Sequence, residues 1–143
     1  MVRKRENNTI ILAYYGTGKS YLASTDDTIT ELTYSNNHPT VEQLQKALEE
    51  FDVILVDPMW KRILVEGHYS FHIVVPSIGL KGEYLERFKA RQKAGKGNGK
   101  LGFVRSMASR WEGLIGELKN TPCLSLTELN NGQYLADVIN NIV

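Results

Sequence analysis

The chain has 143 residues, and its 42% hydrophobic and 23% charged content is typical of a folded globular protein rather than a disordered one. The apolar runs are strand-length, and the basic start lacks the apolar stretch of a secretion signal, so we expect no membrane segment. One cysteine excludes an internal disulfide and fits a reducing, cytoplasmic location. A net charge of +1 argues against a general nucleic-acid binder, and we expect no duplex partner.

Strands and helices are predicted to alternate along the chain. The apolar run 10–14 predicts a first strand, which a glycine-rich loop and a short helix to about Ala23 follow. A β-branched run predicts a second strand over 28–34. Thr40 and Gln43 then have the spacing of a capping box, which predicts the start of an amphipathic helix.

The middle of the chain contains the most apolar run. The segment 52–57 is an unbroken apolar run with an aspartate at each end, as expected for a central parallel strand covered on both faces. Pro58 suits the first turn of a helix that ends at Gly67. Residues 69–75 predict a further buried strand, which Pro76 terminates.

The second half predicts a helix over about 82–92, a Gly/Lys loop at 94–100, a long helix from Phe103 and a final strand over 123–126. A closing helix follows. Five strands alternating with helices predict a three-layer αβα fold, with a central parallel sheet of about five strands and helices on both faces. We expect one domain over 1–143, with ligands bound beyond the carboxyl ends of the strands.

The most informative motif follows the first strand and reads Ala13-Tyr14-Tyr15-Gly16-Thr17-Gly18-Lys19-Ser20. It matches the phosphate-binding pattern G-x-x-x-x-G-K-[ST] except for Ala13 in place of the first glycine. In such loops, backbone N–H groups converge on a phosphate. The motif predicts that Lys19 reaches the β- and γ-phosphates and that Ser20 ligates Mg²⁺. We therefore expect ATP to contact Tyr15, Gly16, Thr17, Gly18, Lys19, Ser20 and Tyr21.

Two residues around the third strand are candidates for the same site. Asp57 ends the apolar run, where a carboxylate can lie near Mg²⁺, although an Asp before Pro is also a good helix cap. Arg62 lies about one helical turn further on, and its planar guanidinium suits a second phosphorylated ligand. An ordinary exposed arginine is the alternative.

Positive charge is concentrated in one segment. Nine of the seventeen Lys and Arg residues fall between Lys81 and Arg110, which favours a small, highly anionic ligand. Arg87 and Arg91 share one helical face by their spacing. We expect a short basic lid over about 82–110 that neutralises charge on a transferred phosphoryl group. A helix surface with Glu83 or Glu86 paired to Arg87 is the alternative.

With the loop at 15–20, the strand at 52–57 followed by Arg62, and the segment 83–91, the sequence resembles small phage-type nucleotide kinases of the P-loop class, distantly similar to adenylate kinase. The last segment is similar to the E-Y-x-x-R-x-x-x-R lid of that family. The resemblance implies ATP- and Mg²⁺-dependent phosphoryl transfer to a nucleoside monophosphate in the host cytoplasm. It implies that Arg62 anchors the acceptor phosphate, that Arg87 and Arg91 are lid arginines, and that Glu31 and Ser35 belong to the acceptor site.

Two other functions stay open at this point. One is a kinase for a nucleoside or polynucleotide 5′-hydroxyl, which needs a base that a phosphate acceptor does not; Asp26, Asp27 or Glu31 would then serve. The other is a catalytically degenerate nucleotide-binding accessory protein of a phage. The acceptor base and sugar and the formation of a homodimer are also left open.

Overall fold

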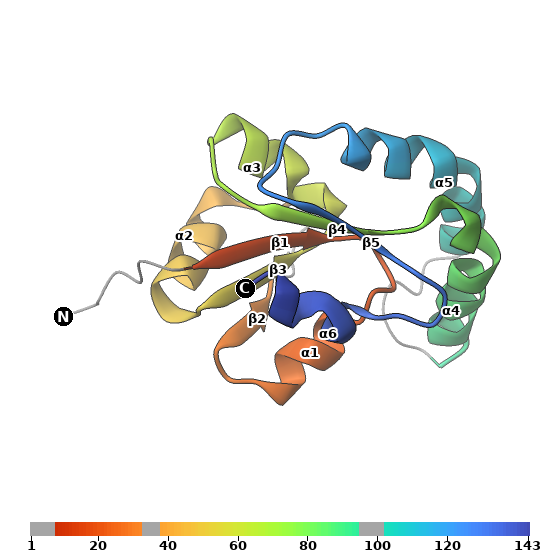
Figure 1. Ribbon diagram of the computed structural model, residues 1–143, viewed down its shortest axis with the longest axis horizontal. Coiled ribbons are helices and arrows are strands. Elements are labelled where there is room, and N and C mark those ends of the chain that lie inside the picture. The colour runs from red at the N-terminus through yellow and green to blue at the C-terminus, as the bar shows by residue number, and fades with distance from the viewer. Residues whose placement is uncertain (1–7, 33–37, 95–101) are drawn as a thin grey trace.

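The computed structural model describes residues 8–32, 38–94 and 102–143. Five strands form one parallel sheet: β1 (Thr9–Ala13), β2 (Ile29–Glu31), β3 (Val53–Val56), β4 (His72–Pro76) and β5 (Leu126–Leu129). Their order is β2-β3-β1-β4-β5, so β1 lies at the centre (Figure 1). The predicted five-stranded parallel sheet is confirmed.

Helices cover both faces of this sheet (Figure 1). One face carries α1 (Lys19–Thr25) and α6 (Leu135–Val138), and the other carries α2 (Val41–Glu50), α3 (Lys61–Glu66) and α5 (Phe103–Lys119). Helix α4 (Lys81–Lys93) packs against α5 at the carboxyl end of the sheet. Three single 3₁₀ turns, η1 (Pro58–Trp60), η2 (Ile78–Leu80) and η3 (Ile139–Asn141), complete the described elements. None of the helices in the described ranges is long and apolar enough to cross a membrane.

The side chains of β1 alternate between the two halves of the core. Ile11 and Ala13 belong to the cluster that includes Leu22 of α1 and Leu135 of α6, whereas Leu12 belongs to the cluster on the side of α2 and α5. All are fully buried apart from Leu22, which is 8% exposed. Burial on both faces explains why the central strands are unbroken apolar runs.

Helix α2 begins as the sequence predicts. The Oγ1 atom of Thr40 accepts a hydrogen bond from the backbone N–H of Gln43 at 3.2 Å, and the Gln43 side chain accepts from the N–H of Thr40 at 3.3 Å. The predicted capping box is confirmed. The helix predicted from Pro58 begins as the η1 turn and continues as α3.

The predicted position of the last strand is wrong. We expected residues 123–126, but β5 begins at Leu126 and runs to Leu129. Leu124 is 62% exposed, and its backbone N–H already bonds to the carbonyl of Phe71 in the approach to the sheet. At a sheet edge the backbone pairing decides where a strand begins, and apolar residues alone do not show it. Pro76 likewise closes β4 instead of lying beyond it, while most of the predicted 94–100 loop lies outside the described residues.

Candidate functional site

The segment between β1 and α1 is a curved loop at the carboxyl end of the central strand. Gly16 and Gly18 have φ angles of 78° and 92°, in the left-handed region that side chains rarely adopt. A Cβ atom on Gly16 would also lie 2.9 Å from the ring of Phe88. Thr17 is fully buried, and its Oγ1 donates to the carbonyl of Tyr14 at 2.8 Å. The glycines at these two positions are therefore required by the shape of the loop.

Lys19 places its ammonium group inside this curve. Its Nζ donates to the carbonyl oxygens of Ala13 at 3.1 Å and Tyr14 at 3.0 Å, and the residue is only 7% exposed. Burial lowers the pKa of Lys19 to about 8, with a smaller contribution in the same direction from Arg91, while Glu31 and Asp57 act in the opposite direction. No carboxylate of the described residues forms an ion pair with it.

A cavity of about 640 Å³ opens beside this ammonium group. Three of its four charged lining side chains are cationic, so the cavity favours an anionic ligand, and its volume is that of a small-molecule site. It is lined by Gly16, Gly18, Lys19, Ser20, Tyr21, Glu31, Arg87, Ala90, Arg91 and Tyr134.

Oxygen atoms of the kind that bind Mg²⁺ belong to Ser20 and Glu31, which line the cavity, and to Asp57, which does not. The Ser20 hydroxyl donates to Oε1 of Glu31 at 2.5 Å. The Asp57 carboxylate caps η1 by accepting from the N–H of Met59 at 2.8 Å, and its charge still acts on Lys19. The described residues contain no cluster of three metal-ligating side chains. This donor set fits Mg²⁺, which is commonly held by few protein oxygens together with phosphates and waters.

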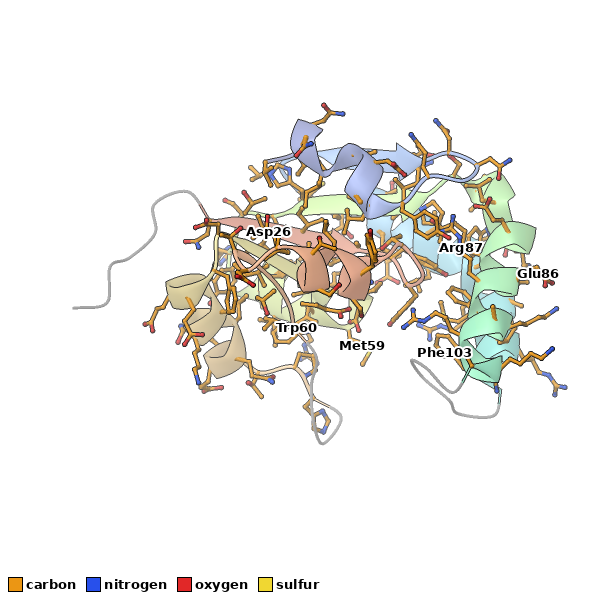
Figure 2. All side chains as sticks on the ribbon, turned by 90° about the horizontal axis from the view of Figure 1, so that it is seen from below. Asp26, Met59, Trp60, Glu86, Arg87 and Phe103 are labelled. Atoms are coloured by element: carbon orange, nitrogen blue, oxygen red, sulfur yellow. The ribbon has the colours of Figure 1, made fainter. Side chains whose placement is uncertain are left out.

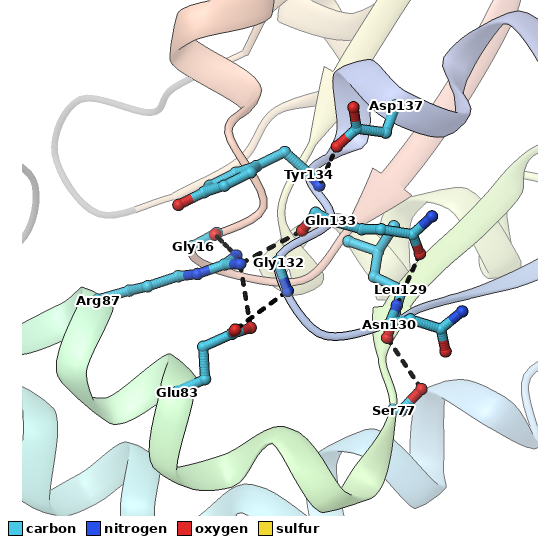
Figure 3. A network of polar contacts seen from close by, with 10 residues as sticks. All are labelled: Gly16, Ser77, Glu83, Arg87, Leu129, Asn130, Gly132, Gln133, Tyr134 and Asp137. Carbon is cyan, nitrogen blue, oxygen red and sulfur yellow. Dashed lines mark hydrogen bonds and ion pairs between the residues drawn. The ribbon is translucent and has the colours of Figure 1, made fainter.

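Arg87 is bound to the loop itself. Its guanidinium donates to the carbonyl of Gly16 at 2.8 Å, to Glu83 at 3.1 Å and to the carbonyl of Gln133 at 3.3 Å (Figure 3). The same group lies 4.3 Å from the ring centroid of Tyr84 and 4.0 Å from that of Tyr134. Its side chain is 13% exposed. The expected pairing with Glu83 is present, and most of the donors of Arg87 bind the protein.

Arg91 lies one turn further along α4 and lines the cavity. It is exposed and has no ion pair among the described residues, so its charge is available to a ligand of the cavity. Arg87 lies on the side of α4 that faces the sheet, and Glu86 lies on the opposite side of the helix (Figure 2). The spacing of the two arginines therefore brings both to the site, in different surroundings.

Four predicted site residues of the described ranges do not line the cavity: Tyr15, Thr17, Asp57 and Arg62. Arg62 is on α3 with its side chain 87% exposed, donates to Glu66 at 2.5 Å and does not line the cavity. Tyr15 packs against Phe103, with ring centroids 6.1 Å apart, and Lys19 lies 5.8 Å from its ring. Ser35 lies outside the described residues. The role of each in binding stays a prediction.

Tyr134 is a site residue that the sequence did not suggest. It is 45% exposed, and its ring lies 3.3 Å from the position of a Cβ atom on Gly18. The next backbone N–H, that of Leu135, donates to the carbonyl of Thr17 at 2.8 Å. An aromatic residue just after the turn at Gly132 was the only local signal. A second cavity of about 530 Å³ shares Gly18, Tyr21 and Tyr134 with the first.

Comparison with known proteins finds no family model, curated protein or solved structure that matches this chain. The interpretation of the site therefore rests on its own residues and geometry.

Proposed function

We propose that this chain is an ATP-dependent kinase that transfers the γ-phosphoryl group to a small acceptor. The observation that carries the proposal is the environment of Lys19. It is a buried cation whose hydrogen bonds among the described residues go to two carbonyl oxygens, with no ion pair there, and it borders a cavity with two further cations. Leaving a charge in such surroundings is costly unless an anion meets it. The triphosphate of ATP supplies that anion.

The donor roles follow from the surroundings of each residue. Lys19 would bind the β- and γ-phosphates, and Arg91 would approach them from α4. Mg²⁺, held through Ser20 with Asp57 close by, would neutralise charge on the phosphates. Arg87 would hold the loop in its curved shape through the carbonyl of Gly16. Tyr21 and Tyr134 offer aromatic surface beside the loop for the nucleoside of the donor.

The residue that the resemblance assigns to the acceptor lies away from the cavity. The resemblance implies a nucleoside monophosphate bound by Arg62. That side chain is paired with Glu66 outside the cavity. The contacts described above thus support binding of the donor. They do not assign the acceptor.

Calorimetric titration with ATP and Mg²⁺ tests the donor half. Lys19→Met should weaken binding by at least about tenfold, because it removes a charge–phosphate contact worth more than 1.4 kcal/mol. Lys46→Met is the matched control, since Lys46 is exposed on α2. Equal affinity of the wild-type chain and Lys19→Met for ATP, or no binding by either, would show that the proposal is wrong.

A further inference from the structure

Glu31 is the one carboxylate among the described residues that line the cavity of about 640 Å³. It is the last residue of β2, so it lies at the carboxyl end of the sheet, as do the loop and Lys19. Its Oε1 accepts a hydrogen bond from Ser20 at 2.5 Å, next to the lysine that would hold the γ-phosphate. A negative group thus borders a site that is otherwise cationic.

The other carboxylates suggested by the sequence are not in this position. Asp26 and Asp27 come before β2, at the opposite end of that strand from Glu31. Asp26 accepts hydrogen bonds from the backbone and side chain of Thr28 at 2.8 Å and 2.7 Å. Of the three candidate bases, only Glu31 lines the cavity.

The charge of Glu31 itself is unfavourable for a phosphorylated acceptor. A nucleoside monophosphate brings about two negative charges and needs cations beyond those that would hold ATP and the loop, yet Arg62, the cation that the resemblance assigns to it, is 87% exposed and paired with Glu66. A carboxylate that lines the same cavity would repel such an acceptor. An alcohol has the opposite requirement, because its hydroxyl must lose a proton to become a good nucleophile.

We propose that the acceptor is a small uncharged alcohol of the nucleoside class, and that Glu31 is the catalytic base that takes its hydroxyl proton. This inference rests on the proposed donor function. In the step, Glu31 accepts the proton while the alcohol oxygen forms a bond to the γ-phosphorus of ATP. The bond between that phosphorus and the β,γ-bridging oxygen breaks, and its electron pair leaves with ADP. The products are a phosphate monoester, ADP and protonated Glu31, which returns its proton to solvent.

The first experiment measures phosphoryl transfer from Mg²⁺–ATP by the full chain. Its arms are the common nucleosides, the corresponding nucleoside monophosphates and a 5′-hydroxyl oligonucleotide. Turnover of at least one nucleoside is expected. Transfer only to monophosphates, only to the oligonucleotide, or to none of these while ATP binds would overturn the inference and leave donor binding intact. Absence of ATP binding would instead show that the proposed function is wrong.

The second experiment assigns the role of Glu31. Glu31→Gln keeps the shape and an acceptor for the Ser20 hydroxyl, and it should lower kcat for the nucleoside about 100-fold or more with the Mg²⁺–ATP affinity unchanged. Asp27→Asn is the control, since Asp27 is exposed and away from the cavity, and it should keep wild-type kcat. Unchanged kcat in Glu31→Gln would overturn the base role. A loss of Mg²⁺–ATP affinity that matches the loss of kcat would also overturn it, by making Glu31 a metal ligand.

Discussion

The guanidinium carbon of Arg87 lies over the ring of Tyr134, 4.0 Å from its centroid, so the side chain from α4 contacts the ring that precedes α6. The same carbon also lies over the ring of Tyr84, 4.3 Å from that centroid. Hydrogen bonds from Arg87 to Gly16 and Gln133 add the glycine loop to this contact (Figure 3). One side chain thus joins α4, the glycine loop and the segment after β5.

Replacing this arginine by lysine should disturb all three segments. Arg87→Lys keeps the charge but loses the planar group that contacts two rings and donates in several directions. We expect the free energy of unfolding to fall by about 2 kcal/mol and ATP affinity to fall with it, because the loop loses its tie at Gly16. Urea unfolding and calorimetry measure the two effects.

Arg105→Lys is the matched control, because Arg105 is exposed on α5 and has no ion pair among the described residues. Its free energy of unfolding should stay within about 0.5 kcal/mol of the wild type. If Arg87→Lys behaves like this control, Arg87 does not hold the loop and is available to the ligand.

Two glycine-to-alanine changes should shift the free energy of unfolding in opposite directions. Gly16 has a φ of 78° and no room for a Cβ atom next to Phe88, so Gly16→Ala should destabilise the fold by about 1–3 kcal/mol. Gly113 lies in α5 with nothing within 4 Å of its Cβ position, so Gly113→Ala should stabilise it by about 0.5–1 kcal/mol. Thermal unfolding of both variants checks the pair. A neutral Gly16→Ala would mean that the loop is less constrained than its backbone angles indicate.

The sheet and the loop could be predicted from local pattern. Unbroken apolar runs mark strands buried on both faces, and Gly16 and Gly18 sit where the backbone turns into the left-handed region. Both signals can be recognised in a short stretch of sequence, although the contacts that complete the sheet and the loop come from distant segments. The edge strand β5 could not be placed as well, because its side chains are mostly exposed and its limits depend on pairing with β4.

The contacts within the site were less accessible to sequence reasoning. Spacing puts Arg87 and Arg91 on one helical face, but only the fold shows that Gly16 and Gln133 occupy the donors of Arg87. Such contacts join residues far apart in the chain, and no local periodicity encodes them. A local signal did exist for Arg62, because Glu66 follows it by four residues, the spacing of a helical ion pair.

The pKa of Lys19 leads to a prediction about pH. Burial holds this pKa at about 8 in the folded chain, below the value of 10.5 for an exposed lysine. Between these two values the unfolded chain binds more protons than the folded one, so the free energy of unfolding contributed by Lys19 should rise with pH over that interval. Below about pH 8 Lys19 is charged in both the folded and the unfolded chain, so the cost of burying its charge does not change with pH.

ATP binding should respond in the opposite direction, because the triphosphate requires the charged form of Lys19. Affinity should decline as the pH rises above about 8, and binding near that pH should take up protons. Calorimetry in buffers with different ionisation enthalpies measures this uptake. The Lys19→Met variant serves as the control and should lose most of the uptake along with its affinity. Proton release, or equal uptake in the variant, would assign the titration to another group and leave Lys19 without a role in charge recognition.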